Sequence, residues 1–279
     1  MTSRTTTPSP AGTPPSSHIA FYKFVELADP DAVAAWLRSV TVAVKGSVLV
    51  AREGINGVLA GTDEALQGVE SALRQDPRFA DLSFKRSACT TEPFGRMKVH
   101  SRPEIVSVGL PTHDTSGPGG VDVSPEDWRR LITEDDVVLL DNRNSFEFRL
   151  GHFQGAIDPG VTHFRDFPRY VESHAAQWRA EGKRVAMYCT GGIRCEKTGA
   201  WMRQTLGLPV YQLEGGILNY FQTLPDAERD WQGECFVFDN RIALDTRLRE
   251  TATTAEQVYA DEPDGEWRLL RARRLDEAG

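Results

Sequence analysis

The sequence RVAMYCTGGIRCEKTGAWMRQTLG, residues 184–207, decides the class of the fold. An apolar run ends at Cys189, a glycine-containing turn follows, and a helix-forming segment starts near Arg194 and closes at Gly207. The pattern predicts a strand, a tight loop and a helix, which is the repeating unit of parallel α/β sheets. Because sites in such sheets form at the carboxyl ends of strands, Cys189 stands at a candidate functional site.

The residues after Cys189 favour a thiolate at that position. The loop consists of Thr190, Gly191, Gly192 and Ile193. Its glycines allow successive N–H groups to turn toward one point, the following helix adds its positive end, and Arg194 adds a guanidinium. Such surroundings lower the pKa of a cysteine and make it reactive. The alternative interpretation is a buried, inert Cys189 beside glycines that only close a turn.

Of the other three cysteines, one is a candidate for a redox role and two are expected to be structural. Cys195 is either a resolving thiol that forms a disulfide with Cys189 or a small residue packed under the loop. We expect Cys89 and Cys235 to be structural. Four cysteines in 279 residues do not make a disulfide scaffold, and no CxxC or paired-histidine spacing accompanies them, so no metal site is predicted.

The segment LLDNRNSFEFRLGHFQGAI, residues 139–157, precedes the loop and, together with YCTGGIR, resembles the rhodanese domain. The resemblance implies that Asp141 and Arg143 brace the loop and that Glu147 and His152 fix the preceding turn. The four residues between Cys189 and the next arginine match rhodanese-like sulfurtransferases, whereas related phosphatases have one more. The shorter loop suits a persulfide-sized adduct better than a phosphate, which disfavours a phosphatase.

Composition and pattern divide the rest of the chain. Residues 1–17 are rich in Ser, Thr and Pro and predict a disordered leader. Residues 18–109 read as β-α-β-β-α-β, which predicts a ferredoxin-like (acylphosphatase-like) α+β domain. Residues 110–123 have the composition of a linker, and residues 124–232 alternate strands and helices, which predicts a rhodanese-like α/β domain with a mostly parallel sheet. Residues 233–279 form a C-terminal extension.

Charge and hydropathy exclude some classes of function. The chain carries 32 basic and 40 acidic residues, a formal charge of −8, which argues against indiscriminate nucleic-acid binding but allows a local basic patch. Its apolar runs fall short of the roughly 18 residues that a membrane-spanning helix needs. The N-terminus also lacks the apolar core of a secretory signal, so we expect a cytoplasmic protein.

A wider resemblance covers the chain from about residue 18 to about 245. It is carried by AREGINGVLAG (51–61), PFGRMKV and EIVSVG (within 93–109), YCTGGIRCEKTGAWM (188–202), VYQLEGGILNYF (210–221) and ECFVFDNRIAL (234–244). These segments resemble the bacterial tRNA uridine(34) hydroxylase family. The resemblance implies oxygen-dependent 5-hydroxylation of the wobble uridine, with Cys189 essential, tRNA as partner and molecular oxygen as co-substrate. We find no flavin, haem or non-haem iron motif in the sequence.

A tRNA-binding protein needs basic residues for phosphate contacts. The candidates are Arg52, Lys85, Arg86, Arg96, Lys98 and Arg102, all in the first domain. Phe94, Tyr188 or Phe221 are candidates for stacking on splayed bases. Two alternatives remain open at this point: a rhodanese-type sulfurtransferase that uses a thiosulfate or persulfide donor, and a binding module without catalytic activity.

Overall fold

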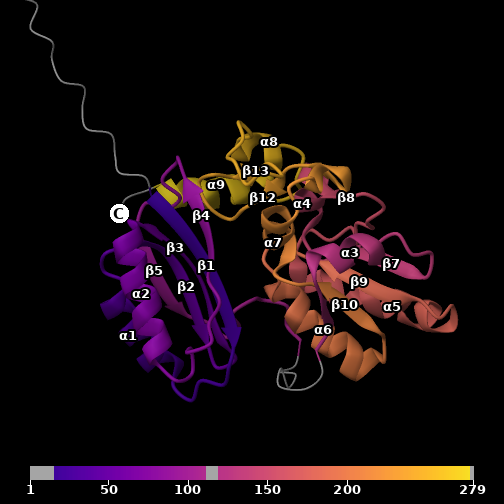
Figure 1. Cartoon of the computed structure of the whole chain (residues 1–279), viewed down its shortest axis with the longest axis horizontal. Coiled ribbons are helices and arrows are strands. Elements are labelled where there is room, and N and C mark those ends of the chain that lie inside the picture. The colour runs from indigo at the N-terminus through magenta and orange to yellow at the C-terminus, as the bar shows by residue number, and fades with distance from the viewer. Residues whose placement is uncertain (1–15, 111–118, 277–279) are drawn as a thin grey trace, which may run out of the picture.

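The computed structural model describes residues 16–110 and 119–276, which form two sheet-containing domains and a C-terminal segment that lies across both (Figure 1). The expected leader, residues 1–17, lies outside the described residues except for its last two. Residues 111–118 of the expected linker also lie outside them. No helix in the described ranges is both long and apolar enough to cross a membrane.

The first domain is a five-stranded sheet in the order β4-β1-β3-β2-β5. Its elements are β1 (Ser16–Phe24), α1 (Pro30–Val40), β2 (Lys45–Ala51), β3 (Gly54–Gly61), α2 (Asp63–Gln75), β4 (Lys85–Cys89) and β5 (Met97–Ser101). The predicted β-α-β-β-α-β connection is confirmed, and β5 extends the sheet parallel to β2. Asp29 and Thr62 cap the two helices by accepting hydrogen bonds from Ala32 and Ala65 N–H.

Both helices of the first domain cover one face of its sheet (Figure 1). Strand alternation turns Ile19, Phe21 and Val48 into the core beneath the helices, where they are buried. The intervening residues, such as Tyr22 and Lys98, are half-buried on the opposite face. This second face carries the side chains with which the domain meets its neighbour.

The second domain contains a four-stranded sheet in the order β6-β10-β9-β7, and all of its pairs are parallel. Its elements are β6 (Val121–Val123), α3 (Pro125–Leu131), β7 (Val137–Asp141), α4 (Ser145–Leu150), β8 (Gly151–Phe153), η1 (Phe164–Asp166), α5 (Phe167–Ala180), β9 (Arg184–Tyr188), α6 (Ile193–Leu206), β10 (Val210–Leu213), α7 (Gly216–Thr223), η2 (Ala227–Arg229) and β11 (Trp231–Gly233). The predicted parallel α/β sheet is confirmed. The segment expected as linker contributes β6 to its edge.

The C-terminal extension contains β12 (Cys235–Phe236), β13 (Ala243–Leu244), α8 (Ala255–Tyr259) and α9 (Gly265–Asp276). It touches both domains. Glu250 accepts hydrogen bonds from Thr90 and Thr91 N–H of the first domain, and Arg268 donates to the Thr162 carbonyl of the second at 2.7 Å. The extension therefore fixes how the two domains face each other.

Candidate active site at the domain interface

The predicted strand, loop and helix around Cys189 are present. Cys189 directly follows β9, which lies between β7 and β10, and α6 begins at Ile193. Gly192 has φ of +100°, in the left-handed region that favours glycine, and its N–H donates to Cys189 Sγ at 3.1 Å. The loop thus turns a backbone amide onto the sulfur, as the sequence predicted.

Cys189 is stabilised as a thiolate although it is only 1% exposed. Burial alone would raise its pKa. Hydrogen bonds from the Cys195 thiol and from the Cys195 and Gly192 N–H groups, together with the charge of Arg194, outweigh burial and lower the pKa of Cys189 to about 5. A fully buried cysteine without these partners behaves differently, since burial raises the pKa of Cys235 to about 12. The inert interpretation of Cys189 therefore disagrees with its surroundings.

Arg194 acts on the sulfur through its charge, while its guanidinium is bound to Glu147. Nη1 and Nη2 of Arg194 donate to the two carboxylate oxygens of Glu147 at 2.8 and 2.7 Å, and the Glu147 side chain is fully buried. This fork fixes the arginine side chain. The sequence assigned Glu147 and His152 to the preceding turn. Glu147 also accepts a hydrogen bond there from the Asn144 N–H at 3.1 Å, and His152 Nδ1 lies 2.9 Å from the Phe148 carbonyl oxygen.

Cys195 lies beneath the loop, fully buried, and neither it nor Cys189 takes part in a disulfide. Burial and the neighbouring thiolate raise the pKa of Cys195, so its thiol keeps its proton and donates toward Cys189. Asn142 Nδ2 donates to Thr198 Oγ1 at 2.7 Å and lies 3.8 Å from Cys195 Sγ. In this arrangement Cys195 is a hydrogen-bond donor to the thiolate.

Asp141 and Arg143 form a buried ion pair behind the loop, with Arg143 Nε and Nη2 at 2.8 and 2.6 Å from the carboxylate. Arg143 also donates to the Gly151 carbonyl and lies over the ring of Tyr188, the residue before Cys189. Their contacts hold the end of β9 in place. Among the described residues, His, Cys, Asp and Glu side chains form no group of three or more suited to a metal ion.

Two glycines at the start of α7 also fix the loop, and the sequence analysis assigned them no role. Gly215 and Gly216 both have φ near +70°, and a Cβ at Gly216 would lie 2.5 Å from the Cys189 carbonyl oxygen. The first turn of α7 uses this close approach, because Ile217 N–H donates to the Cys189 carbonyl at 3.0 Å. The motif LEGG at residues 213–216 was the available signal.

The first domain contributes directly to the loop. Lys85 Nζ donates to the Gly191 and Gly215 carbonyls, and it lies 5.6 Å from the centre of the Tyr22 ring. Burial lowers the pKa of Lys85, while the negative charges of Cys189 and Glu196 oppose this. The sequence assigned Lys85 to RNA, but its ammonium group points into the protein and seals one side of the loop.

A second lysine ties the domains together beside the loop. Lys197 Nζ lies 2.9 Å from Glu53 and 2.7 Å from Glu104 carboxylate oxygens, and it also donates to the Val106 carbonyl at 3.1 Å. The lysine is 6% exposed. This buried cluster connects the first helix turns after the loop to the β2–β3 turn and to the segment after β5. It places the active-site loop at a fixed domain interface.

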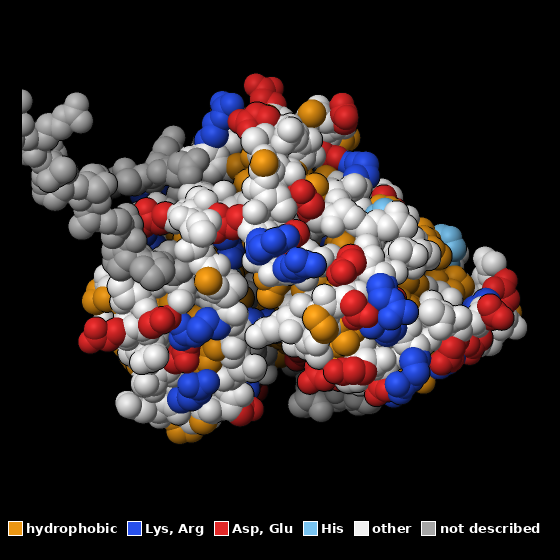
Figure 2. All heavy atoms as spheres, turned by 45° about the horizontal axis from the view of Figure 1, so that its top comes forward, with side chains coloured by type: hydrophobic (Ala, Val, Ile, Leu, Met, Phe, Trp, Pro, Cys, Tyr) orange, Lys and Arg blue, Asp and Glu red, His pale blue; other side chains and the backbone are white. Residues whose placement is uncertain are grey.

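The remaining basic candidates differ in their surroundings. Arg86, on β4, forms ion pairs with Asp63 and Glu70 of α2, at 2.8 and 2.5 Å. Arg52, Arg96 and Arg102 are exposed, and Lys98 is half-buried. On the face shown in Figure 2, basic and acidic side chains are interspersed, so phosphate contacts require a local cluster.

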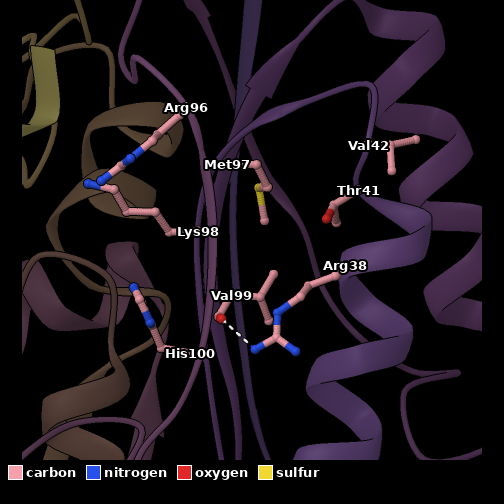
Figure 3. Close-up of a pocket in the computed structure, with 8 residues that line it drawn as sticks. All are labelled: Arg38, Thr41, Val42, Arg96, Met97, Lys98, Val99 and His100. Atoms are coloured by element: carbon pink, nitrogen blue, oxygen red, sulfur yellow. Dashed lines mark hydrogen bonds between the residues drawn. The ribbon is translucent and has the colours of Figure 1, made fainter. Parts of the chain in front are cut away.

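Such a cluster surrounds a hollow of about 690 Å³ at the β5 edge of the first domain. Figure 3 shows Arg96, Lys98 and His100 pointing away from α1, with Arg38 on the helix side, where it donates to the Val99 carbonyl. Partial burial and the charges of Arg102, Lys98, Arg38 and Arg96 lower the pKa of His100. These four basic side chains around one imidazole make the local potential positive.

The aromatic residues expected to stack on bases are not available for it. Phe94, Tyr188 and Phe221 are at most 4% exposed. Phe94 packs on His18, and Tyr188 and Phe221 pack around Trp231 in the core of the second domain. Any stacking surface must come from other rings.

Comparison with known families agrees with this architecture. The model of the UPF0176 acylphosphatase-like domain matches residues 16–105, and that of the rhodanese-like domain matches residues 124–223. These matches confirm the two predicted fold classes.

Curated relatives match along most of the chain. A protein of Synechococcus elongatus named tRNA uridine(34) hydroxylase is 48% identical over 233 residues, covering 83% of this chain and 86% of that protein. A Legionella pneumophila protein of the same name is 42% identical over 242 residues, covering 86% of this chain and 94% of that protein. The solved structure BlrP1 BLUF matches 33% of this chain and 68% of that chain at 23% identity, with a TM-score of 0.29, which is too low to inform the fold or a ligand.

Proposed function

This chain belongs to the tRNA uridine(34) hydroxylase family, and we propose on that basis that it hydroxylates the wobble uridine of tRNA at carbon 5, with Cys189 as the reactive group. The observation that carries the role of Cys189 is its lowered pKa, about 5, in a loop whose amide and thiol groups donate to the sulfur. At neutral pH such a cysteine is a thiolate, the nucleophilic form. Because the substrate is tRNA, we place the protein in the cytoplasm.

A thiolate suits the chemistry of the uracil ring. Addition of Cys189 Sγ to carbon 6 would form a C–S bond and make carbon 5 electron-rich, and elimination would later break that bond and release the product. Replacing C5–H by C5–OH is a two-electron oxidation. With molecular oxygen as oxidant, the second oxygen atom leaves as water and takes two electrons and two protons from an external reductant.

The basic edge at β5 supplies the RNA contact in this proposal. Residues that pair directly across neighbouring strands lie on the same face of a sheet, and such pairs connect Lys98 on β5 to Lys85 on β4. The paired residues, from β5 to β4, are Lys98, Ser47, Val58, Ala20 and Lys85. Four strand spacings separate these two lysines, about 19 Å. Phosphates held at the β5 edge would thus lie at the border of the sheet face that carries Lys85, which contacts the Cys189 loop. Arg52 and Arg102 directly follow the parallel strands β2 and β5, so both lie at the carboxyl ends of these two strands.

The test is mass spectrometry of tRNA nucleosides from a strain that lacks the protein. Complementation with the wild type should restore 5-hydroxyuridine at the wobble position, and Cys189→Ala should not. Cys235→Ala is the matched control, because Cys235 is equally buried but its pKa is raised to about 12. Equal restoration by wild type and Cys189→Ala would remove Cys189 from the reaction.

A rhodanese-type sulfurtransferase is the second candidate, since the same loop in a rhodanese-like domain suits a persulfide on Cys189. Thiocyanate formation from thiosulfate and cyanide measures this activity without RNA. The sulfur is 1% exposed, and Lys85 and Tyr22 of the first domain lie against the loop, so either substrate reaches the sulfur only when these contacts open. Because no RNA is present in this assay to bind the interface, we expect slow turnover of thiosulfate. Fast turnover by the purified protein would favour the sulfurtransferase.

A further inference from the structure

An exposed phenyl ring lies near the guanidinium group of Arg194, the residue that follows the active-site loop. Phe238 is 55% exposed, and the guanidinium carbon of Arg194 lies 5.7 Å from the centre of its ring. Arg194 follows the loop directly, and its charge is one of the causes of the low pKa of Cys189. Phe238 therefore presents an apolar face to solvent next to one of the residues that stabilise the thiolate.

The ring is held on a rigid turn between β12 and β13. Val237 N–H donates to the Ile242 carbonyl at 2.9 Å, and Ile242 N–H donates to the Asp239 carbonyl at 3.0 Å. The ring of Phe238 also meets the buried ring of Phe236 edge-to-face, with centroids 4.9 Å apart. A ligand that contacts Phe238 would thus lose little conformational entropy in ordering it.

The turn is also anchored to the first domain. Asn240 N–H donates to the Pro93 carbonyl at 3.1 Å, and Arg241 Nη1 donates to Ser87 Oγ at 3.1 Å. Arg241 and Asp239 form a buried ion pair at 2.7 Å. Because Ser87 lies on β4, the strand that also carries Lys85, the same strand positions both Phe238 and the closed side of the loop.

The chemistry of this position fits a nucleobase. Enzymes that modify a base within RNA take it out of its stack and bind it against aromatic or apolar side chains. Splayed bases of loops stack on aromatic rings, and arginine guanidinium groups add to such sites. The three rings expected to do this from sequence are buried, whereas Phe238 is exposed and adjacent to Arg194.

We propose that Phe238 is a base-stacking residue that holds the displaced wobble uracil beside Cys189. The inference rests on the proposed function and adds the residue that binds the base. In this proposal Phe238 contributes to binding of the base, whereas Arg194 and the loop amides stabilise the thiolate of Cys189.

The experiment is a double-mutant cycle between protein and RNA. Wild type and Phe238→Ala are each titrated with an anticodon stem–loop RNA that carries uridine at the wobble position and with the same RNA abasic at that position, by fluorescence anisotropy. Stacking of one base contributes about 1–3 kcal/mol, so Phe238→Ala should weaken binding of the uridine RNA roughly 5- to 150-fold. It should change binding of the abasic RNA less than about twofold, because the stacked base is missing.

Two further variants separate stacking from bulk. Phe238→Trp should bind as tightly as the wild type or more tightly, whereas Phe238→Leu, which keeps apolar volume without a π face, should behave like Phe238→Ala. Trp267→Ala is the matched control, since Trp267 is 53% exposed and has Arg271 at 5.5 Å from its ring but lies on α9. This control should bind both RNAs like the wild type.

Equal losses with uridine and abasic RNA, or no loss in Phe238→Ala, would overturn the stacking role. Failure of the proposed function would look different, because it is read from nucleoside mass spectrometry of reactions with the wild type. If the wild type forms no 5-hydroxyuridine but the cycle shows coupling, the base-binding site stands and the assigned reaction falls.

Discussion

Replacing Arg194 by Gln tests how the loop depends on its buried ion pair. Glu147 is fully buried and accepts two charge-assisted hydrogen bonds from Arg194, at 2.8 and 2.7 Å, and a third from the Asn144 N–H at 3.1 Å. Removing one partner of such a pair leaves an uncompensated buried charge and typically costs about 3–5 kcal/mol. Arg194→Gln should therefore lose about this much free energy of unfolding, which urea titration at neutral pH measures from the midpoint and slope.

The double variant Arg194→Gln/Glu147→Gln separates stability from thiolate chemistry. With both charges gone, two amides of similar size can hydrogen-bond, and most of the lost stability should return. The pKa of Cys189 should nevertheless rise above that of the wild type, because the charge of Arg194 no longer favours the thiolate. Arg169→Gln, at an 80% exposed side chain, is the control and should change stability by less than about 0.5 kcal/mol.

The reasoning would be refuted if Arg194→Gln were as stable as the wild type, or if the double variant were less stable than the single one. The first result would mean that Glu147 finds another partner or is solvated. The second would mean that the shape of the arginine side chain, rather than the ion pair, holds the loop.

Three other predictions concern the loop and the interface. Gly192→Ala should lower the free energy of unfolding by about 1–3 kcal/mol and raise the pKa of Cys189, because φ of Gly192 is +100° and a Cβ there would lie 2.9 Å from the Tyr22 hydroxyl oxygen. Gly191→Ala is the control: no atom lies within 4 Å of a Cβ at Gly191, so it should cost less in the same urea titration. Lys197→Met should lower the urea midpoint by an amount that corresponds to about 3–5 kcal/mol, because it leaves two largely buried carboxylates unpaired; a midpoint like that of the wild type would contradict a fixed interface. Because the folded thiol has a pKa of about 5 against an ordinary 9.0, the stability of the wild type relative to Cys189→Ser should rise with pH between about 5 and 9 and level off above, and a flat difference would show that Cys189 is not ionised.

The sequence was most informative where the chemistry is local. Cys189, its glycines and Arg194 lie within six residues, so periodicity and glycine position were enough to predict the strand, the loop and the direction of the pKa shift. The alternation of strands and helices likewise predicted a parallel sheet for the second domain. These features depend on neighbours along the chain.

Contacts between distant segments were beyond such reasoning. Lys85 reaches a carbonyl 106 residues away, and a basic residue on a strand of the first domain looks the same in sequence whether it faces RNA or a neighbouring loop. Phe238 lies in the quoted segment ECFVFDNRIAL, yet only the fold brings it to Arg194. Alternation along a strand indicates which residues share a face, but it does not indicate what that face meets.

The most direct measurement is the ultraviolet absorbance of the thiolate as a function of pH, in the wild type and in Cys189→Ser. The other three cysteines do not interfere below about pH 9, since burial raises the pKa of Cys89 to about 11 and of Cys235 to about 12, and the pKa of Cys195 is also raised. The account predicts a one-thiolate transition near pH 5 that is absent in Cys189→Ser. A wild type whose first thiol ionises only above pH 8.5 would contradict it.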